Sequence, residues 1–257
     1  MGPARLCSSA KSNHIGIILI SAVFSVVPGE NKNNYLEYLA TEVALYYERS
    51  GTPTNPFQQD LDGFSPSRIL DLGCGAGQEL LVFANHHCTL KVGADIQFEA
   101  GEVFKRIHPG TENDRTVFIN SAGEELPFGG ESFDLIICRV ALPYMSSAKA
   151  LNEISRVLAP EGRVLLTVHT PRFYFLMIRR RLSDLSIKSL AYPVICFAGG
   201  LWFLITGKQP TGNFWRGKET FHTRVMLERQ LRETGLRILS DSAGEGNGGH
   251  TYLIGKN

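Results

Sequence analysis

The sequence predicts an α/β protein with a mainly parallel sheet, and three observations lead to this fold class. From residue 68 onward, short apolar runs rich in Val and Ile alternate with helical patterns about every 20 to 30 residues, the spacing of βαβ units. A glycine-rich turn follows the first of these runs, as in open sheets that bind ligands at the carboxyl ends of their strands. The 257 residues are 43% hydrophobic and 20% charged, a composition that supports one sizeable core.

Five strands are expected along the central part of the chain, over residues 68–72, 89–95, 116–120, 133–138 and 162–169. The helical patterns between them cover residues 78–85, 98–106 and 146–158. A further helix is expected before the sheet, over residues 35–49. Near the carboxyl terminus we expect a helix over 225–234 and two strands over 237–239 and 251–254, joined by the glycine-rich residues 244–249.

The charge balance and the cysteines limit the class of protein. The chain has 26 Lys and Arg against 25 Asp and Glu, so its net charge of +1 gives no overall basic field for nucleic acid. Its five cysteines are widely spaced without a Cys-x-x-Cys pair, which argues against a disulfide framework and a zinc site. No histidine pair has metal-ligand spacing, so no metal is predicted. We therefore expect a cytoplasmic protein that binds no nucleic acid.

Residues 15–27 form an uncharged run of 13 behind Arg5 and Lys11, which is the outline of the apolar part of a signal peptide. The run is too short to span a bilayer. The alternatives are a mis-assigned start codon, a frayed amphipathic leader and an N-terminal strand. Residues 1–29 are accordingly separated, as a leader or apolar segment, from a domain over residues 30–257.

A second apolar stretch, residues 189–207, lies in a long insertion over residues 171–224, between the fifth strand and the final hairpin. Its length is about that of a membrane helix. A single crossing is excluded if the hairpin completes the sheet, because the last helix and strands would then lie across the membrane from their own sheet. Three interpretations remain open: a lid over a lipophilic acceptor, a helix pair that dips into a membrane, and core packing.

Basic residues lie beside this stretch, namely Arg172, Arg179, Arg180, Arg181 and Lys188. Such residues next to an apolar segment that bears Trp and Tyr are typical of helices at a membrane interface. Peripheral contact with a membrane through residues 172–206 is therefore one expectation. The lid and the membrane interpretation both favour a hydrophobic substrate.

The motif with the clearest chemistry is Ile-Leu-Asp-Leu-Gly-Cys-Gly-Ala-Gly at residues 69–77, an apolar strand that runs into a glycine-rich turn. Glycine admits positive φ and a close approach of ligand to backbone, and the turn lies at a helix start, where negative charge is favoured. The candidate binding residues here are Asp71, Gly73, Cys74, Gly75 and Gly77. A dinucleotide fingerprint would carry a small residue in place of Gln78, so a dehydrogenase is disfavoured.

Two further features follow the next strands. The second strand ends in Asp95 and is followed by Ile96, which places a carboxylate in the ligand crevice, where it could accept both hydroxyls of a ribose. The alternative is that Asp95 caps the following helix. Ala122, Gly123 and Glu124 come after the third strand. Three such features in this order are much less expected by chance than any one of them.

With these motifs the chain resembles the class I S-adenosylmethionine-dependent methyltransferases, in the type 11 branch that includes ubiquinone and menaquinone methyltransferases. The resemblance depends on ILDLGCGAG at 69–77, GADI at 93–96, EELPFGGESFDLI at 124–136 and LNEISRVLAPEGRVLLTV at 151–168. It implies a Rossmann-like seven-stranded sheet with helices on both faces, in which residues 237–254 could supply the final hairpin. It also implies S-adenosylmethionine as cofactor.

The resemblance implies a role for each candidate residue. Asp71 and the glycine turn would hold the methionine part of the cofactor, and Asp95, with Ile96 beside it, the ribose. Residues 122–124 would line the rim of the adenine site, and Arg139 would face the cofactor or the substrate. Many relatives carry Asp where this chain has Ala122, so the adenine contact is expected to rely on backbone groups or on Glu124.

No catalytic side chain is assigned, because methyl transfer gains most from alignment of nucleophile and methyl group. The weak candidates are His169, at the end of the fifth strand, and Tyr144, which could line the substrate pocket. His169 could equally cap a strand end or bond locally. The segment Ala-Leu-Pro-Tyr at 141–144 lacks the Asn or Asp of amine methyltransferases that act on nucleic acids, which argues against adenine or glutamine as the target.

The sequence therefore predicts methyl transfer from S-adenosylmethionine to a small, hydrophobic acceptor, lipid-like or quinone-like. One alternative is an NAD-dependent oxidoreductase, which Gln78 and the later motifs disfavour. Another is a non-catalytic Rossmann-like binding protein. This alternative stays open because methyl transfer requires no obligatory side-chain catalyst whose absence would mark an inactive protein.

Overall fold

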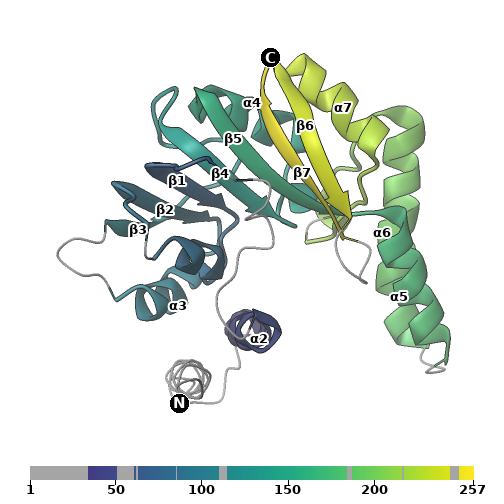
Figure 1. The fold of residues 1–257 in the computed structure, drawn as a ribbon. Helices are drawn as coiled ribbons and strands as arrows, with labels where there is room; N and C mark the ends of the chain where they lie inside the picture. The colour runs from purple at the N-terminus through teal and green to yellow at the C-terminus, as the bar shows by residue number, and fades with distance from the viewer. Residues whose placement is uncertain are drawn as a thin grey trace, which may run out of the picture.

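The computed structural model describes residues 34–50, 61, 63–84, 86–109, 115–183, 187–215, 217–243 and 249–257. Within these ranges a single seven-stranded sheet has the order β3-β2-β1-β4-β5-β7-β6 (Figure 1). Strands β1 to β5 are parallel, and β7 is antiparallel to both of its neighbours. The strands are β1 Arg68–Leu72, β2 Leu90–Asp95, β3 Thr116–Asn120, β4 Phe133–Arg139, β5 Leu158–His169, β6 Leu236–Ala243 and β7 Gly249–Lys256. The predicted Rossmann-like sheet with its final hairpin is confirmed.

The helices also follow the prediction, with two differences. They are α2 Asn34–Ser50, α3 Ala100–Ile107, α4 Ser147–Val157, α5 Pro171–Ser183, α6 Ile187–Thr206 and α7 Arg224–Glu233. The helix expected over 78–85 is a short 3₁₀ helix, η1 Gln78–Phe83. The helix expected over 146–158 ends at Val157, because Leu158 is already extended and pairs with Phe133 as the start of β5. Short 3₁₀ turns lie at η2 Leu142–Tyr144 and η3 Asn213–Trp215.

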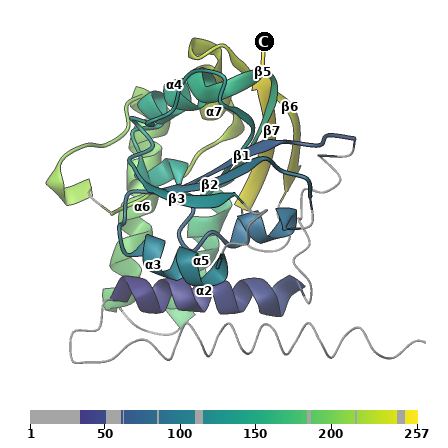
Figure 2. The ribbon, with the colours of Figure 1, turned by 90° about the vertical axis from the view of Figure 1, so that its left-hand side faces the viewer.

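Helices cover both faces of the sheet because its central strands are apolar on both sides. Side chains alternate along each strand, so Leu70 and Ile136 enter one core and Ile69 and Leu135 enter the other. The first core is closed by α4 and α7 and the second by η1 and α3. Figures 1 and 2 show these two layers of helices on opposite sides of the sheet.

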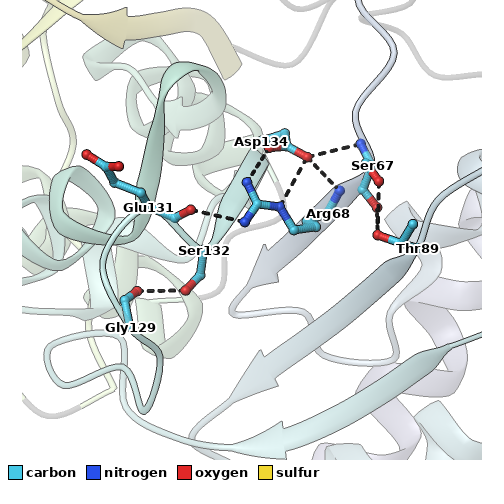
Figure 3. Close-up of polar contacts among 7 residues, drawn as sticks. All are labelled: Ser67, Arg68, Thr89, Gly129, Glu131, Ser132 and Asp134. Carbon is cyan, nitrogen blue, oxygen red and sulfur yellow. Dashed lines mark hydrogen bonds and ion pairs between the residues drawn. The ribbon is translucent and has the colours of Figure 1, made fainter.

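The amino ends of β1 and β4 are held together by Asp134 and Arg68 (Figure 3). Asp134 Oδ2 accepts the backbone N–H groups of Ser67 and Arg68 at 3.2 and 2.9 Å, and Arg68 Nη2 donates to Asp134 Oδ1 at 2.7 Å. Arg68 also donates to the carbonyl of Glu131 at 3.2 Å. This polar cluster lies at the opposite end of the strands from the glycine-rich turn.

The insertion over residues 171–224 contains α5, α6 and η3, and α5 and α6 pack side by side as a helical hairpin (Figure 1). Its inner face belongs to the fold, because Tyr174, Cys196 and Phe203 form a buried cluster with Phe221 and Met226. The interpretation as core packing therefore holds for this face. Among the described residues, no helix is both long and apolar enough to cross a bilayer.

Helix α6 continues through Pro193 and through the glycine pair at 199–200, a sequence that is unfavourable for a regular helix in water. Both glycines are needed for packing. A Cβ at Gly199 would lie 2.5 Å from the ring of Trp215, and a Cβ at Gly200 would overlap the ring of Phe221. The leader predicted over residues 1–29 and the loop expected around Pro53 and Pro56 lie outside the described residues.

Candidate functional site

The candidate site lies at the carboxyl ends of β1, β2 and β4. From the β1–β4 pair, the chain adds β2 and β3 on one side and β5 on the other. Ligands of open α/β sheets bind at this kind of switch point. The turn after β1 enters the crevice with Gly73, Gly75 and Gly77 at φ of 70°, 52° and 79°. A Cβ at Gly73 would overlap Ala141, so this position requires glycine both for its backbone conformation and for its contact.

Asp71 is the last polar side chain of β1 before this turn, and it is nearly completely buried, at 1% exposure. Its Oδ2 atom has no hydrogen-bond partner in the described part of the chain. Burial raises the pKa of Asp71 well above its ordinary value, the nearby Glu79 raises it further, and Arg139 opposes both. A buried carboxylate oxygen without a partner is costly, and a cationic ligand group would satisfy it. The residue therefore fits the ammonium of an amino acid.

Asp95, at the end of β2, is engaged with the neighbouring backbone. Its Oδ2 accepts from the N–H of Gly75 at 2.9 Å and its Oδ1 from the N–H of Gln97 at 2.8 Å. The carboxylate thus ties β2 to the glycine turn, and each oxygen keeps a second lone pair for a ligand hydroxyl. Asp95 does not precede α3 directly, since that helix begins at Ala100 after Glu99. Ile96 is largely exposed beside it, at the rim.

The segment after β3 contains Ala122, Gly123 and Glu124, which the resemblance assigns to the rim of the adenine site. Gly123 is buried under Met145, and a Cβ there would lie 2.5 Å from the sulfur. The carboxylate of Glu124 accepts the N–H of Ser146 at 2.7 Å, so it is bound to the start of α4. Ala122 is half-buried and presents only backbone polar groups.

Arg139, at the end of β4, is paired with two glutamates that sequence reasoning missed. Its Nη1 lies 2.5 Å from Oε1 of Glu79 in η1, and its Nη2 lies 4.0 Å from Oε2 of Glu42 in α2. Glu79 is buried in the otherwise apolar segment that follows the glycine turn. A buried acid in such a segment is the signal that could have indicated a pairing with a cation. Arg139 thus joins β4, η1 and α2 at the edge of the crevice.

Helix α2 packs against the glycine turn and α3, and Figure 2 shows it running beneath α3. It is held by Leu39, Ala40 and Val43, which pack in one cluster with Ala76 and with residues of α3. Tyr35 of this helix is close enough to Asp95 for that carboxylate to add to the effect of burial in raising the tyrosine's pKa. The sequence predicted this helix but not its position over the site.

The two weak catalytic candidates lie on the β5 side of the site. His169 Nδ1 is 3.0 Å from Oε2 of Glu219, a buried residue of the insertion. Tyr144 is about half exposed, at 52%, and lines a pocket of about 450 Å³ that Trp215, Lys218 and Thr220 also line. The Oγ1 atom of Thr220 is buried without a hydrogen-bond partner among the described residues.

Solved structures share the fold of this chain. A methyltransferase dependent on S-adenosylmethionine from Methanosarcina mazei aligns with a TM-score of 0.54 at 18% identity, over 79% of this chain and 98% of that chain. A TehB-like S-adenosylmethionine-dependent methyltransferase from Corynebacterium glutamicum aligns with a TM-score of 0.57 at 14% identity, over 88% and 100%. The fold is that of the S-adenosylmethionine-dependent methyltransferases, and at these identities the likeness shows the fold alone.

Sequence comparison then shows which family the central segment is similar to. Residues 70–166 match the model of the family described as methyltransferase domain, Methyltransf_11. Residues 70–166 are thus similar to a methyltransferase domain of type 11, in agreement with the predicted resemblance, and this match supports S-adenosylmethionine as the cofactor.

Curated relatives match over the same central part. The chain is 40% identical over 107 residues to the uncharacterized methyltransferase YcgJ of Bacillus subtilis, which is 40% of each chain. It is 33% identical over 126 residues to a demethylmenaquinone methyltransferase of Clavibacter sepedonicus, 48% of this chain and 49% of that one. It is 31% identical over 101 residues to a 27-O-demethylrifamycin SV methyltransferase of Amycolatopsis mediterranei, 38% of this chain and 37% of that one. The matched segments thus span less than half the length of these relatives.

Proposed function

We propose that this protein transfers a methyl group from S-adenosylmethionine to a small, hydrophobic acceptor. The observation that carries the proposal is the buried, unpartnered oxygen of Asp71 beside a turn of three glycines. The donor has an ammonium and a carboxylate on the same carbon. Asp71 would bind the ammonium, and the backbone N–H groups of the first residues of η1, directly after the turn, would bind the carboxylate. Asp95 would accept the ribose hydroxyls through its remaining lone pairs.

The bound donor supplies an electrophilic methyl on a sulfonium, and the chain has to align the acceptor with it and exclude water. Alignment of this kind is worth up to roughly 7 to 11 kcal/mol. Met145 at the base of the crevice and α2 at its wall would restrict water there. We also propose that residues 30–257 act as one domain with the insertion over 171–224 beside the acceptor.

Support for a hydrophobic acceptor comes from the residues around the β5 side of the site. Tyr144 and Trp215 line the pocket, and the aromatic residues Phe173, Tyr174 and Tyr192 lie in the neighbouring cluster. Two of the relatives named above act on demethylmenaquinone and on a demethylrifamycin by their names. Tyr144 and Trp215 would stack on a flat ring, and Gln209, Asn213 and Lys218 of the same pocket would meet its polar groups.

Peripheral contact with a membrane is the second part of this proposal. The outer face of α6 exposes Val194, Leu201, Trp202, Leu204 and Ile205, with Ile205 at 80% exposure. Neither α5 nor α6 contains an acidic residue, whereas α5 carries Arg172 and Arg179 on exposed positions. An apolar face next to basic residues matches an anionic membrane surface.

The membrane part is tested by sedimentation with vesicles of anionic and of neutral lipid. The wild type should sediment with anionic vesicles, and Trp202→Glu together with Ile205→Glu should abolish sedimentation. Val225→Glu is the matched control, because Val225 is equally exposed but lies on α7. Sedimentation of the double variant at the level of the wild type would contradict membrane contact by α6.

The methyl-transfer part is tested by calorimetric titration of the full chain with S-adenosylmethionine, followed by mass spectrometry of cell lipids and metabolites incubated with methyl-labelled donor. We expect donor binding that Asp71→Ala and Asp95→Ala abolish while the fold is kept, and a labelled apolar product. Binding of NAD in place of the donor would support the oxidoreductase alternative. Donor binding without any labelled product would support a non-catalytic binding protein.

A further inference from the structure

An imidazole–carboxylate pair lies at the end of β5, outside the donor-binding residues. Glu219 is buried, at 3% exposure. A carboxylate is rarely buried unless it has a partner. Its Oε2 lies 3.0 Å from Nδ1 of His169. The insertion brings the two together across 50 residues, and the N–H of His222 donates to the carbonyl of His169 at 3.0 Å to fix the returning chain.

The ring of His169 is held in one orientation. It stacks on Phe173 with 3.6 Å between ring centroids and 5° between planes, and the ring of Tyr174 meets it edge-on. A carboxylate on Nδ1 keeps the proton there and leaves the lone pair on Nε2. Nε2 has no partner among the described residues and is not one of the buried polar atoms, so solvent reaches it.

The pair lies on the same edge of the sheet as the donor residues. Strand β5 is next to β4, and the N–H of Val140 donates to the carbonyl of Thr167, two residues before His169, at 2.8 Å. Ala141 then contacts the glycine turn at Gly73. Tyr38 of α2 is near both groups, because Glu219 and Asp95 add to the effects of burial and of Glu42 in raising its pKa.

We propose that His169 is the catalytic base of this methyltransferase, that Glu219 is its positioning residue, and that the acceptor is a hydroxyl group on an aromatic or enolic ring. The inference deepens the proposed function and depends on it. In the step, the acceptor O–H proton moves to Nε2 of His169 while the oxygen lone pair forms the new O–C bond. The methyl C–S bond breaks with its electron pair going to sulfur, and the imidazolium later releases the proton to water.

A hydroxyl is the acceptor that requires such a pair. Its neutral oxygen is a weak nucleophile and gains from a base, whereas a thiol ionises readily without one. The tyrosines near Glu219 cannot take the place of His169. Burial, and then the charge of Glu219, raises the pKa of Tyr144 and of Tyr174, so both hydroxyls keep their protons at neutral pH. Tyr192 is likewise kept protonated by burial.

The test uses two probes with the same apolar ring and different nucleophiles, 2-naphthol and 2-naphthalenethiol, with methyl-labelled S-adenosylmethionine and the full chain. We expect His169→Gln to slow methylation of the naphthol about 100-fold or more, and Glu219→Gln about 10-fold or more. The rate with the thiol should change less than about 3-fold, and higher pH, which ionises the naphthol, should restore the variants. Donor affinity by calorimetry should be unchanged.

His250→Gln is the matched control, because His250 also pairs with a carboxylate, that of Asp241 at 2.7 Å, but on β6 and β7. This variant should methylate the naphthol at the wild-type rate. Equal losses on both probes in His169→Gln would show a structural role and overturn the inference, as would donor binding by the wild type without methylation of the naphthol. Failure of the wild type to bind the donor would instead contradict the proposed function.

Discussion

Asp71 and Asp134 are aspartates of the two neighbouring central strands, at opposite ends and in opposite environments. Asp134 accepts three donor groups of Ser67 and Arg68 (Figure 3), and these hydrogen bonds outweigh desolvation and lower its pKa. Oδ2 of Asp71 has no donor within the described part of the chain, and burial raises the pKa of this residue. The first carboxylate stabilises the fold, whereas the second destabilises it until a cation binds.

This contrast predicts opposite effects of the same substitution. The folded-state pKa of Asp71 lies above its unfolded value, so ionisation of Asp71 lowers stability as pH rises. Asp71→Asn should therefore raise the melting temperature at pH 7. The same variant should bind the donor at least about 100-fold more weakly. Asp134→Asn should cost about 1–3 kcal/mol and leave donor affinity unchanged. Calorimetric titration and thermal unfolding measure both. A lower melting temperature for Asp71→Asn would contradict the conclusion that the buried carboxylate destabilises the fold.

His222 predicts part of the acid sensitivity of the protein. It is fully buried, with Nε2 3.2 Å from the hydroxyl of Ser147, and burial lowers its pKa to about 4. The unfolded chain binds a proton near pH 6.5, so stability is complete above that pH and falls as pH decreases toward 4.

Between pH 7 and 4.5 this single group should account for about 2–3 kcal/mol, measured by urea unfolding. His222→Gln should lower stability at pH 7 but flatten its dependence on pH. His87→Gln is the control, because His87 is exposed. An equally steep dependence in His222→Gln would exclude this histidine as the cause.

At the residue scale, the sequence predicted groups close together in the chain better than groups joined by tertiary contact. Asp71, the glycine turn and Asp95 follow apolar strands, so their place at the carboxyl edge is set by the alternation of strands and helices. Glu79, Glu42 and Glu219 were not predicted as partners. Each meets its cation or imidazole through packing of elements that lie far apart in the sequence.

At the scale of elements, strands and amphipathic helices were predicted to within a few residues because their periods are local. The structure of the insertion was not predicted, because the same apolar pattern is compatible with a lid, a membrane-surface helix and a core helix. Helix α6 has a buried face with Phe203 and an exposed apolar face with Trp202, so its apolar pattern does not belong to the core alone. Only the position of the helix against α7 and the sheet shows which of its faces is buried.

Helix α2 provides a test at this scale. It is held to the donor turn by Leu39, which approaches Gly75 closely, and it pairs with Arg139 through Glu42. Because α2 walls the crevice, donor binding should slow hydrogen exchange of amides in residues 35–43, measured by mass spectrometry. Residues 224–233 of α7, on a distant part of the fold, should not change. Unaltered exchange in 35–43 at saturating donor would contradict a wall formed by α2.

The glycine turn provides a second test. Gly73→Ala introduces a side chain at φ of 70° and against Ala141, so it should cost about 2–4 kcal/mol and reduce donor binding. Gly129→Ala is the control, because a Cβ there would meet Ser132 at an ordinary 3.7 Å. Equal stability of the two variants in urea unfolding would contradict the steric requirement at Gly73.

At the scale of the whole molecule, the order of the strands determines where the chemistry can occur. The chain order of the strands reverses between the parallel strands β1 and β4, and their carboxyl ends meet the glycine turn, helix α2 and the insertion after β5. Donor residues, the pocket with Tyr144 and the His169–Glu219 pair therefore share one edge. Figures 1 and 2 show α2 at this end of the sheet and α5 leading away from it.

A crystal structure of the full chain with S-adenosylhomocysteine tests the location of the donor most directly. We expect the ligand in the crevice, with its amino group within hydrogen-bond distance of Asp71, its carboxylate on the turn of residues 73–77 and its ribose hydroxyls on Asp95. A ligand bound elsewhere, or a crevice from which the saturating ligand is absent while Asp71 stays buried and unpartnered, would contradict a donor site at this edge.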